Sequence, residues 1–166
     1  MKVEVLKENL KSGLGIVERI VGKNISLPIL NNVLISTEES FLNLISTDLE
    51  TIINLWILTK IIKKGKVVIP AKIFSHFISS LPNEKITIEA RGNNLYIECE
   101  NIRTQIQGYN PEEFPLIPEF KNVEYIEVDN KTFCQSLSQV IDIPFPSQAR
   151  PEISGIYFSF SKNNIK

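Results

Sequence analysis

One spacing of apolar residues occurs three times in the chain and limits what it can fold into. In each copy, an apolar residue that ends a short alternating stretch is followed by apolar residues five, then four, then three positions further along. The copies begin at Val5, Ile69 and Val128. Alternation predicts a strand, and steps of four and three predict a helix with one buried stripe. The chain is therefore expected to repeat a strand followed by an amphipathic helix.

Two of these copies belong to a longer repeat. A constant offset of 123 residues places the third copy on the first and carries Pro28 onto Pro151. The same offset continues without a gap to Leu42 and Ile165. Apolar positions could coincide by chance in a chain that is 43% hydrophobic. One fixed offset across helix, loop and strands instead favours a duplicated domain.

A looser repeat lies within the first domain. Residues 33–44 align with residues 86–97 at an offset of 53, and each stretch reads as two alternating strands around a polar turn. Strands with one polar face and helices with one apolar face pack as helices on antiparallel sheets. We expect an internally duplicated α+β fold, with a first domain over residues 1–122 and the start of an incomplete second domain over residues 123–166.

The periodicity also predicts which helix residues are buried and which are exposed. The stripes of the first two helices should share one core, made of Leu10, Leu14, Val17, Phe74, Ile78 and Leu81. The opposite faces carry Glu8, Ser12, Gly15 and Arg19 on the first helix, Lys72, His76 and Ser79 on the second, and Lys131, Gln135 and Ser138 on the third. Only one of these residues is acidic. Such faces are typical of ordinary solvated helices and also of nucleic-acid contacts, and periodicity leaves both open.

Composition excludes several classes of protein. A chain of 166 residues with 22% charged residues can bury a core, and its net charge of −1 gives no overall attraction to nucleic acid or acidic membranes. Cys99 and Cys134 lack metal-ligand spacing and predict reduced thiols. No stretch has the length and continuity of a signal peptide or a membrane span. We therefore expect a cytoplasmic protein without a membrane partner.

No group of residues predicts catalysis, a metal site or a cofactor. His76 is the only histidine, which excludes a catalytic triad or a multi-histidine metal site within this sequence. Asp48 and Glu50 fall on the same face of an alternating stretch with no histidine or lysine nearby in sequence to complete a site. A turn or cap role is favoured for them over an acid–base pair. The sequence predicts a protein that is not an enzyme.

Five stretches, taken in order, resemble one protein family. They are SLPILNNVLIS (26–36), ISTDLE (45–50), GKVVIPAKIFSHFISSLPN (65–83), GYNPEEFPLIP (108–118) and RPEISGIYF (150–158). Each is moderately specific alone, but together they resemble the bacterial DNA sliding clamp, the beta subunit of DNA polymerase III. The resemblance implies three similar domains per subunit, and two subunits that close head to tail into a ring lined by helices. It also implies that this chain is a fragment that ends within its second domain.

The resemblance implies a function in DNA replication. A sliding clamp is a processivity factor that encircles duplex DNA and tethers the replicative polymerase. The implied partners are double-stranded DNA of any sequence, the DNA polymerase III alpha subunit, the clamp loader and a second copy in a homodimer. A ring holds DNA by enclosure, so weak contacts from Lys and Arg to phosphate suffice. The alternative function is a duplicated β-rich adaptor that binds peptides without enclosing DNA.

The resemblance also suggests site residues. In relatives a basic residue just before the Leu-Pro-Ile-Leu stretch contacts DNA, which assigns Lys23 here, with Asn24 as the alternative. With the exposed helix residues, the predicted DNA-binding set is Arg19, Lys23, Asn24, Lys72, His76, Lys131 and Gln135. The family's subunit contact uses an edge strand, here 102–107. Arg103 would pair with acids of the partner and Ile106 would supply apolar contact. The alternative is that both are side chains of an edge strand that contacts no partner.

The stretch TIINLWILTKII (51–62) is more apolar than the resemblance implies for an outer strand. Trp56 and its neighbours could form a contact surface, or the strand could be unusually well covered. The second interpretation is favoured.

Overall fold

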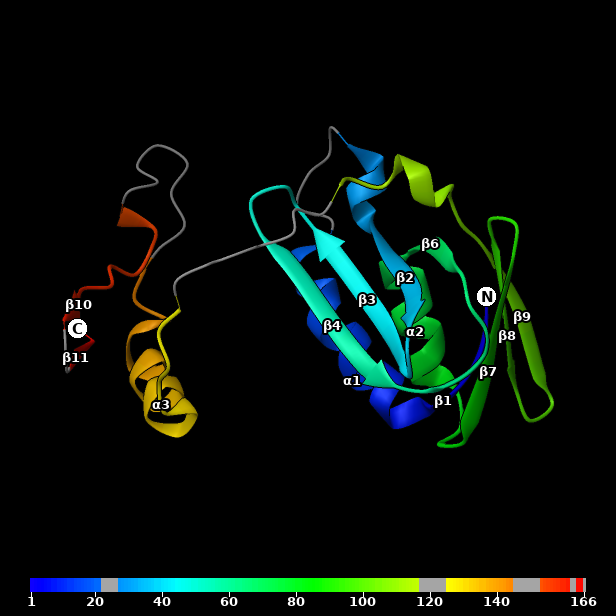
Figure 1. Ribbon diagram of the computed structural model, residues 1–166, viewed down its shortest axis with the longest axis horizontal. Helices are drawn as coiled ribbons and strands as arrows, with labels where there is room; N and C mark the ends of the chain where they lie inside the picture. The colour runs from blue at the N-terminus through cyan, green and yellow to red at the C-terminus, as the bar shows by residue number, and fades with distance from the viewer. Residues whose placement is uncertain (22–26, 117–124, 145–152, 162–163, 166) are drawn as a thin grey trace. The chain divides into compact units, whose positions relative to one another are not determined.

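Contacts between residues divide the chain into two units, Met1–Ile117 and Pro118–Lys166. The computed structural model describes residues 1–21, 27–116, 125–144, 153–161 and 164–165 (Figure 1). The predicted domain boundary after residue 122 falls outside the described residues. Its position therefore stays a prediction.

The first unit combines two helices with two antiparallel sheets. Its elements are β1 (Lys2–Leu6), α1 (Lys7–Val17), the 3-10 turns η1 (Glu18–Ile20) and η2 (Pro28–Asn31), β2 (Asn32–Glu38), β3 (Phe41–Thr47), β4 (Ile52–Leu58), β5 (Lys60–Lys63), β6 (Lys66–Pro70), α2 (Ala71–Ser80), β7 (Lys85–Arg91), β8 (Asn94–Cys99), β9 (Ile102–Gln107) and η3 (Pro111–Glu113). The larger sheet has the strand order β5-β1-β7-β8-β9, and the smaller sheet has the order β4-β3-β2-β6. Figure 1 shows β4, β3 and β2 side by side, with α1 and α2 behind them.

The two halves of this unit exchange strands. β1 leads into α1 but pairs with β7 of the second half, whereas β6 leads into α2 but pairs with β2 of the first half. The end of each half also crosses from one sheet to the other. β5 joins the larger sheet by pairing with β1, and Tyr109, after β9, bridges to Val68 of β6 in the smaller sheet. Neither half can therefore complete its sheet alone.

The register of the strands confirms the predicted repeat of 53 residues. β2 and β7 differ by 53 at both ends, and β3 and β8 begin 53 residues apart. Both hairpins close across two residues in the same register. The first turn residue has a positive φ in each hairpin, 46° at Glu39 and 58° at Gly92, as many two-residue hairpin turns require. The two halves are thus structural copies as well as sequence copies.

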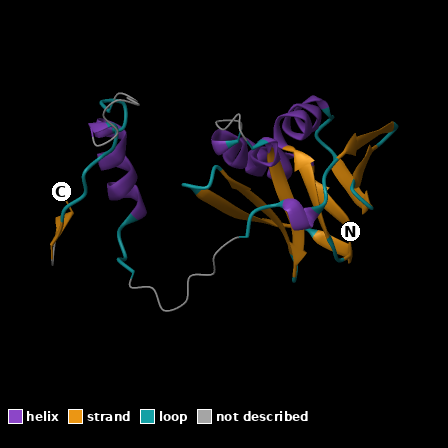
Figure 2. Ribbon diagram, turned by 90° about the horizontal axis from the view of Figure 1, so that it is seen from above, coloured by secondary structure: helices purple, strands orange, loops and turns teal. Residues whose placement is uncertain are grey.

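The two helices supply the centre of the core. The six predicted stripe residues, which are Leu10, Leu14, Val17, Phe74, Ile78 and Leu81, are each at most 4% exposed, which confirms the shared core. α2 ends at Ser80 because Leu81 precedes a proline, which disfavours helical ψ, and Leu81 has a ψ of 156°. Figure 2 shows both helices on one side of the strands of this unit. Their opposite faces are left uncovered by the sheets.

The exposure of Trp56 and Leu58 shows that β4 is not the well-covered strand that the sequence favoured. Alternate residues of a strand point to opposite faces. Ile57 is buried on the inner face, whereas Trp56 is 51% exposed and Leu58 is 66% exposed on the outer one. The apolar excess of this strand therefore lies at the surface.

Gly108 lies where three segments of the chain meet. Its amide donates to the Asn93 carbonyl oxygen at 2.9 Å, and the following amide, of Tyr109, donates to the Val68 carbonyl oxygen at 2.9 Å. A Cβ at this position would meet both of these carbonyl oxygens. Backbone atoms cannot rotate away as the end of a side chain can, so even a methyl group would force the segments apart.

We expect Gly108→Ala to lower the free energy of unfolding by about 3 kcal/mol, as overpacking does. Urea unfolding followed by circular dichroism measures the change. Gly15→Ala is the control, because nothing lies within 4 Å of a Cβ there and alanine favours a helix. A loss below about 1 kcal/mol for Gly108→Ala would contradict the close approach.

The second unit keeps the helix of the longer repeat. α3 (Asn130–Val140) begins and ends 123 residues after α1, and β10 (Phe160–Ser161) pairs with β11 (Asn164–Ile165). Residues 125–129 form no strand, so the prediction of a strand before this helix is wrong. In the first unit β1 is paired on both sides, by β5 and β7, whereas residues 125–129 have no paired strand among the described residues. A strand without neighbours is not stable.

Candidate nucleic-acid interface

The exposed face of α1 leads to an arginine at the end of the helix. Glu8, Ser12, Gly15 and Arg19 are all exposed, as the periodicity predicts. Glu8 lies near the start of α1, where its carboxylate is 3.9 Å from the ammonium group of Lys7. Arg19 follows in η1 and makes no ion pair with any residue that the structure describes. The guanidinium group is therefore available to an anion.

A buried hydroxyl fixes the end of α1. Ser46 of β3 is fully buried and donates to the carbonyl oxygen of Val17, the last residue of α1, at 2.8 Å. The last carbonyls of a helix lack partners within the helix, so this bond satisfies one of them and ties the helix end to the sheet. Ser46 thereby positions the turn that carries Arg19. Sequence reasoning missed it, although a small polar residue inside the apolar FLNLIST stretch is a usable signal.

α2 presents a second basic face. Lys72, His76 and Ser79 are exposed, and Lys72 lies four residues before His76, so the two side chains share one face of the helix. The helix contains no acidic residue. α1 and α2 pack against each other. The first unit thus brings Arg19, Lys72 and His76 onto its two neighbouring helices.

α3 carries the remaining predicted contacts that the structure describes. Lys131 and Gln135 are exposed on this helix. Asp129 begins the helix, accepting hydrogen bonds from the Thr132 hydroxyl at 2.6 Å and from the Thr132 amide at 2.8 Å. The hydroxyl and then the amide lower the pKa of the Asp129 carboxyl group, because they favour its charged form. Lys23 and Asn24 lie outside the described residues.

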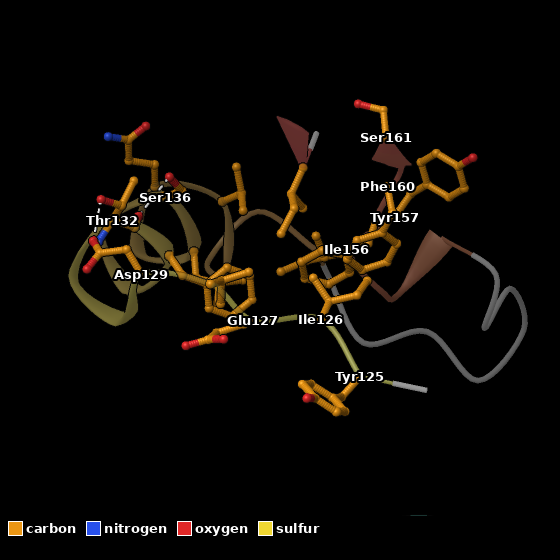
Figure 3. A pocket seen from close by; sticks show the side chains of 17 residues that line it. Tyr125, Ile126, Glu127, Asp129, Thr132, Ser136, Ile156, Tyr157, Phe160 and Ser161 are labelled. Atoms are coloured by element: carbon orange, nitrogen blue, oxygen red, sulfur yellow. Dashed lines mark hydrogen bonds between the residues drawn. The ribbon is translucent and has the colours of Figure 1, made fainter. Parts of the chain in front are cut away.

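The apolar face of α3 lines an open hollow of about 970 Å³. Figure 3 shows the side chains around it, which come from α3 and from stretches before and after that helix. Phe133 and Leu137 are only half-buried, whereas Leu10 and Leu14, 123 residues earlier, are 0% and 1% exposed. The hollow is therefore the uncovered core face of a second copy rather than a formed ligand site.

The predicted subunit edge is β9, one of the two edge strands of the larger sheet. The Arg103 guanidinium group lies 2.7 Å from the Glu98 carboxylate on the neighbouring strand. Ile106 is 8% exposed and belongs to the core. Its side chain therefore packs inward, because it falls on the inner face of the alternating strand, and it offers little apolar surface to a partner.

The described residues contain no arrangement typical of a metal or catalytic site. No three His, Cys, Asp or Glu side chains among them could hold a metal ion. The Asp48 carboxylate accepts from the amides of Glu50 and Thr51 at 3.1 and 2.7 Å, which confirms its predicted turn role. Within the same residues, no helix has the length and apolar character needed to cross a membrane.

Comparison with known proteins gives one consistent family. A family model described as DNA polymerase III beta subunit, N-terminal domain, matches residues 1–118. The beta sliding clamp of Synechocystis sp. is 25% identical over 175 residues, which cover 100% of this chain and 45% of the relative. A putative DNA polymerase III beta subunit from Eubacterium rectale has a TM-score of 0.78 at 30% identity, over 86% of this chain and 39% of that one.

A further structure supports the fold. The Caulobacter crescentus pol III beta structure has a TM-score of 0.86 at 22% identity, over 99% of this chain and 45% of that one. The predicted α+β clamp fold is thereby confirmed. The chain spans less than half the length of these relatives. Because the family model matches well over half of the residues, the chain belongs to the DNA polymerase III beta subunit family.

Proposed function

We propose that the chain forms one sector of a DNA sliding clamp, a non-catalytic processivity factor that encircles duplex DNA. Family membership supports this function and does not favour a peptide-binding adaptor without enclosure. The observation that carries the proposal is the exposed face of α1, η1 and α2. Arg19, Lys72 and His76 are exposed on these elements, and Figure 2 shows the two helices on one side of the strands of this unit.

The charge of the chain fits this function. A net charge of −1 cannot hold DNA tightly, but local cations can contact phosphates without reading sequence. Weak contacts leave a ring free to slide, and enclosure keeps it on the DNA. Lys23, with Asn24 as its alternative, adds to the proposed lining within the first unit, and Lys131 and Gln135 extend it to the second unit.

The proposed partners follow from the clamp function. They are double-stranded DNA, the alpha subunit of DNA polymerase III, the clamp loader and a second copy of the full-length subunit. Replication in bacteria takes place in the cytoplasm, which is the proposed location. The relatives' names support the function, since several are beta sliding clamps.

Charge reversal on the helix face should weaken DNA binding. We expect the chain to bind a short duplex with a Kd no tighter than about 0.1 mM near 0.15 M salt, at the weak end of the nonspecific range. The double variant Arg19→Glu with Lys72→Glu should bind at least about tenfold more weakly at low salt, and its salt slope should fall by about 2, one for each lost phosphate contact. Fluorescence anisotropy with a labelled duplex, titrated at several salt concentrations, measures both.

The matched control reverses two lysines that do not lie on the helices. Lys64→Glu with Lys66→Glu changes the net charge by the same amount but alters exposed residues around the β5–β6 turn. If this control lost as much affinity as the helix variant, binding would depend on net charge alone. That result would contradict a DNA-facing helix surface.

We infer that β9 forms the contact between full-length subunits. An edge strand offers unpaired backbone groups, and the Arg103 side chain stays 78% exposed beside Glu98. Ile106, which the sequence also assigned to this contact, is left unchanged in the test, because it is buried and Ile106→Asp would place a charge in the core.

Arg103→Glu, in a chain completed to the full length of the relatives, should shift the dimer towards monomer by about tenfold in Kd. Sedimentation velocity over a range of concentrations measures the shift. Arg91→Glu is the control, since Arg91 is also exposed and also pairs with a glutamate, but lies on β7 inside the sheet. An unchanged dimer for Arg103→Glu would contradict this edge.

A further inference from the structure

Three exposed apolar side chains lie together on the outer face of the smaller sheet. Phe41, Trp56 and Leu58 are 38%, 51% and 66% exposed. Phe41 faces Leu58 across the β3–β4 ladder, and Trp56 lies two residues before Leu58, so all three point to the same face. Ile57 points the other way, towards α1. Its side chain lies so close to Gly13 of that helix that a Cβ on Gly13 would meet it. The cluster therefore lies on the face opposite α1.

This cluster borders a groove of about 210 Å³ that has Leu58 and Leu6 among its lining residues. Leu6 ends β1 and is 55% exposed. Lys60 and Lys85 also line the groove, and Lys60 lies 3.2 Å from Glu4. Lys85 makes no ion pair with any described residue. A partly hollow site with two apolar side chains and a nearby cation suits an apolar side chain with an acidic neighbour.

A basic turn lies beside the cluster. Residues 60–66 contain four lysines, of which only Lys60 has an ion-pair partner among the described residues. The Thr37 amide donates to the Gly65 carbonyl oxygen at 3.1 Å, and the Gly65 amide donates to the Thr37 hydroxyl at 2.9 Å. These bonds hold the turn against the β2–β3 hairpin, where Phe41 begins β3. In a chain of net charge −1, this local excess of positive charge is complementary to an acidic partner.

Hydrogen bonds within the chain hold the Trp56 side chain in place before any other protein binds. Its indole N–H donates to one oxygen of the Glu38 carboxylate at 3.0 Å, and the other oxygen accepts from the Asn43 side-chain amide at 3.0 Å. A fixed aromatic side chain loses little conformational entropy when another chain packs on it. Both oxygens of the Glu38 carboxylate are thereby used in hydrogen bonds within the chain.

We propose that this outer patch, defined as Leu6, Phe41, Trp56 and Leu58 with the lysines of residues 60–66, is a docking surface for a protein segment that alternates acidic and apolar side chains. One apolar side chain enters the groove beside Leu6 and Leu58, and the segment crosses Phe41 and Trp56 with its acids towards the lysines. The patch lies on the face opposite α1. It therefore stands independently of the DNA-binding proposal.

Binding of a labelled peptide to the whole chain tests this surface. The probe is a fluorescein-labelled peptide that alternates Glu with Leu and Phe, and its comparison peptide has Lys in place of every Glu. We expect the acidic peptide to bind with a Kd below about 1 mM and the basic peptide to bind at least about tenfold more weakly. Leu58→Ser, and separately Lys64→Glu with Lys66→Glu, should each weaken the acidic peptide about tenfold.

Two control variants accompany these, one for the lost apolar side chain and one for charge reversal at a single lysine. Ile73→Ser removes an apolar side chain that is 60% exposed on α2, and Lys11→Glu reverses an exposed lysine on α1. Neither control should change peptide binding, and circular dichroism should show all variants folded. Absence of acidic-peptide binding, equal binding of the basic peptide, or equal loss in the controls would overturn the proposal. So would binding of oligo(dT) or self-association of the chain that Leu58→Ser abolishes, since either would assign the patch to another occupant.

Discussion

Phe74→Ala is expected to lower the free energy of unfolding of the first unit by about 3 to 5 kcal/mol. Phe74 is fully buried in α2 and belongs to the cluster that contains Leu10 and Leu14 of α1. Because Phe74 belongs to one close-packed cluster with residues of both helices and both sheets, its neighbours cannot collapse into the space that its ring leaves. Urea unfolding monitored by circular dichroism measures the loss.

Ile73→Ala is the matched control for this variant. Ile73 neighbours Phe74 on the same helix and has a large apolar side chain, but it is 60% exposed. Its replacement should change the free energy of unfolding by less than about 0.5 kcal/mol, as surface substitutions do. Equal losses for the two variants would show that the buried stripe of α2 has been assigned to the wrong face.

Periodicity predicted the elements that have one buried face. The steps of four and three that begin at Leu10 and Phe74 reflect the helical repeat, and both helices bury those positions. The offset of 53 predicted two hairpins with one register, because alternation and turn residues are local properties of the chain. The outward positions of Arg19, Lys72 and His76 follow from the same geometry.

The arrangement of strands in space could not be predicted in this way. Alternation shows that a strand has an inner and an outer face, but not which sheet it joins. β5 lies in the larger sheet although it directly follows β4, and the Thr59 hydroxyl at this crossing donates to the Glu4 carbonyl oxygen at 2.7 Å. Likewise, the sequence predicted apolar character around Trp56 but not its exposure, because alternation does not show whether another layer packs on the outer face of a strand.

Ile106 shows a related limit. Its position in an edge strand predicted a contact with another subunit, which stays a prediction, but did not predict that its side chain packs into the core. Edge position concerns the backbone, whereas the direction of a side chain depends on which face of the sheet meets the helices. Arg103, three residues earlier, points outward, as the alternation of β9 requires.

Retention on DNA is the other large effect that we expect, because enclosure and affinity respond differently to salt. Contacts from Arg19, Lys72 and Lys131 are electrostatic and weaken steeply as salt rises. At about 1 M salt the Debye length is about 3 Å, so exposed charges attract phosphate only on near-contact. A closed ring survives such a wash because no bond to DNA has to persist. An open sector of a ring does not.

The most direct test compares the 166-residue chain with a version completed to the full length of its relatives. Each is applied to nicked circular DNA, the full-length form together with its clamp loader and ATP, and the DNA is washed in about 1 M salt and then linearised. We predict that the wash removes the 166-residue chain, and that the full-length form survives it and is released only when the circle is cut. Retention of the 166-residue chain through the wash, or of the full-length form after linearisation, would show that affinity rather than topology holds the protein and would contradict the clamp.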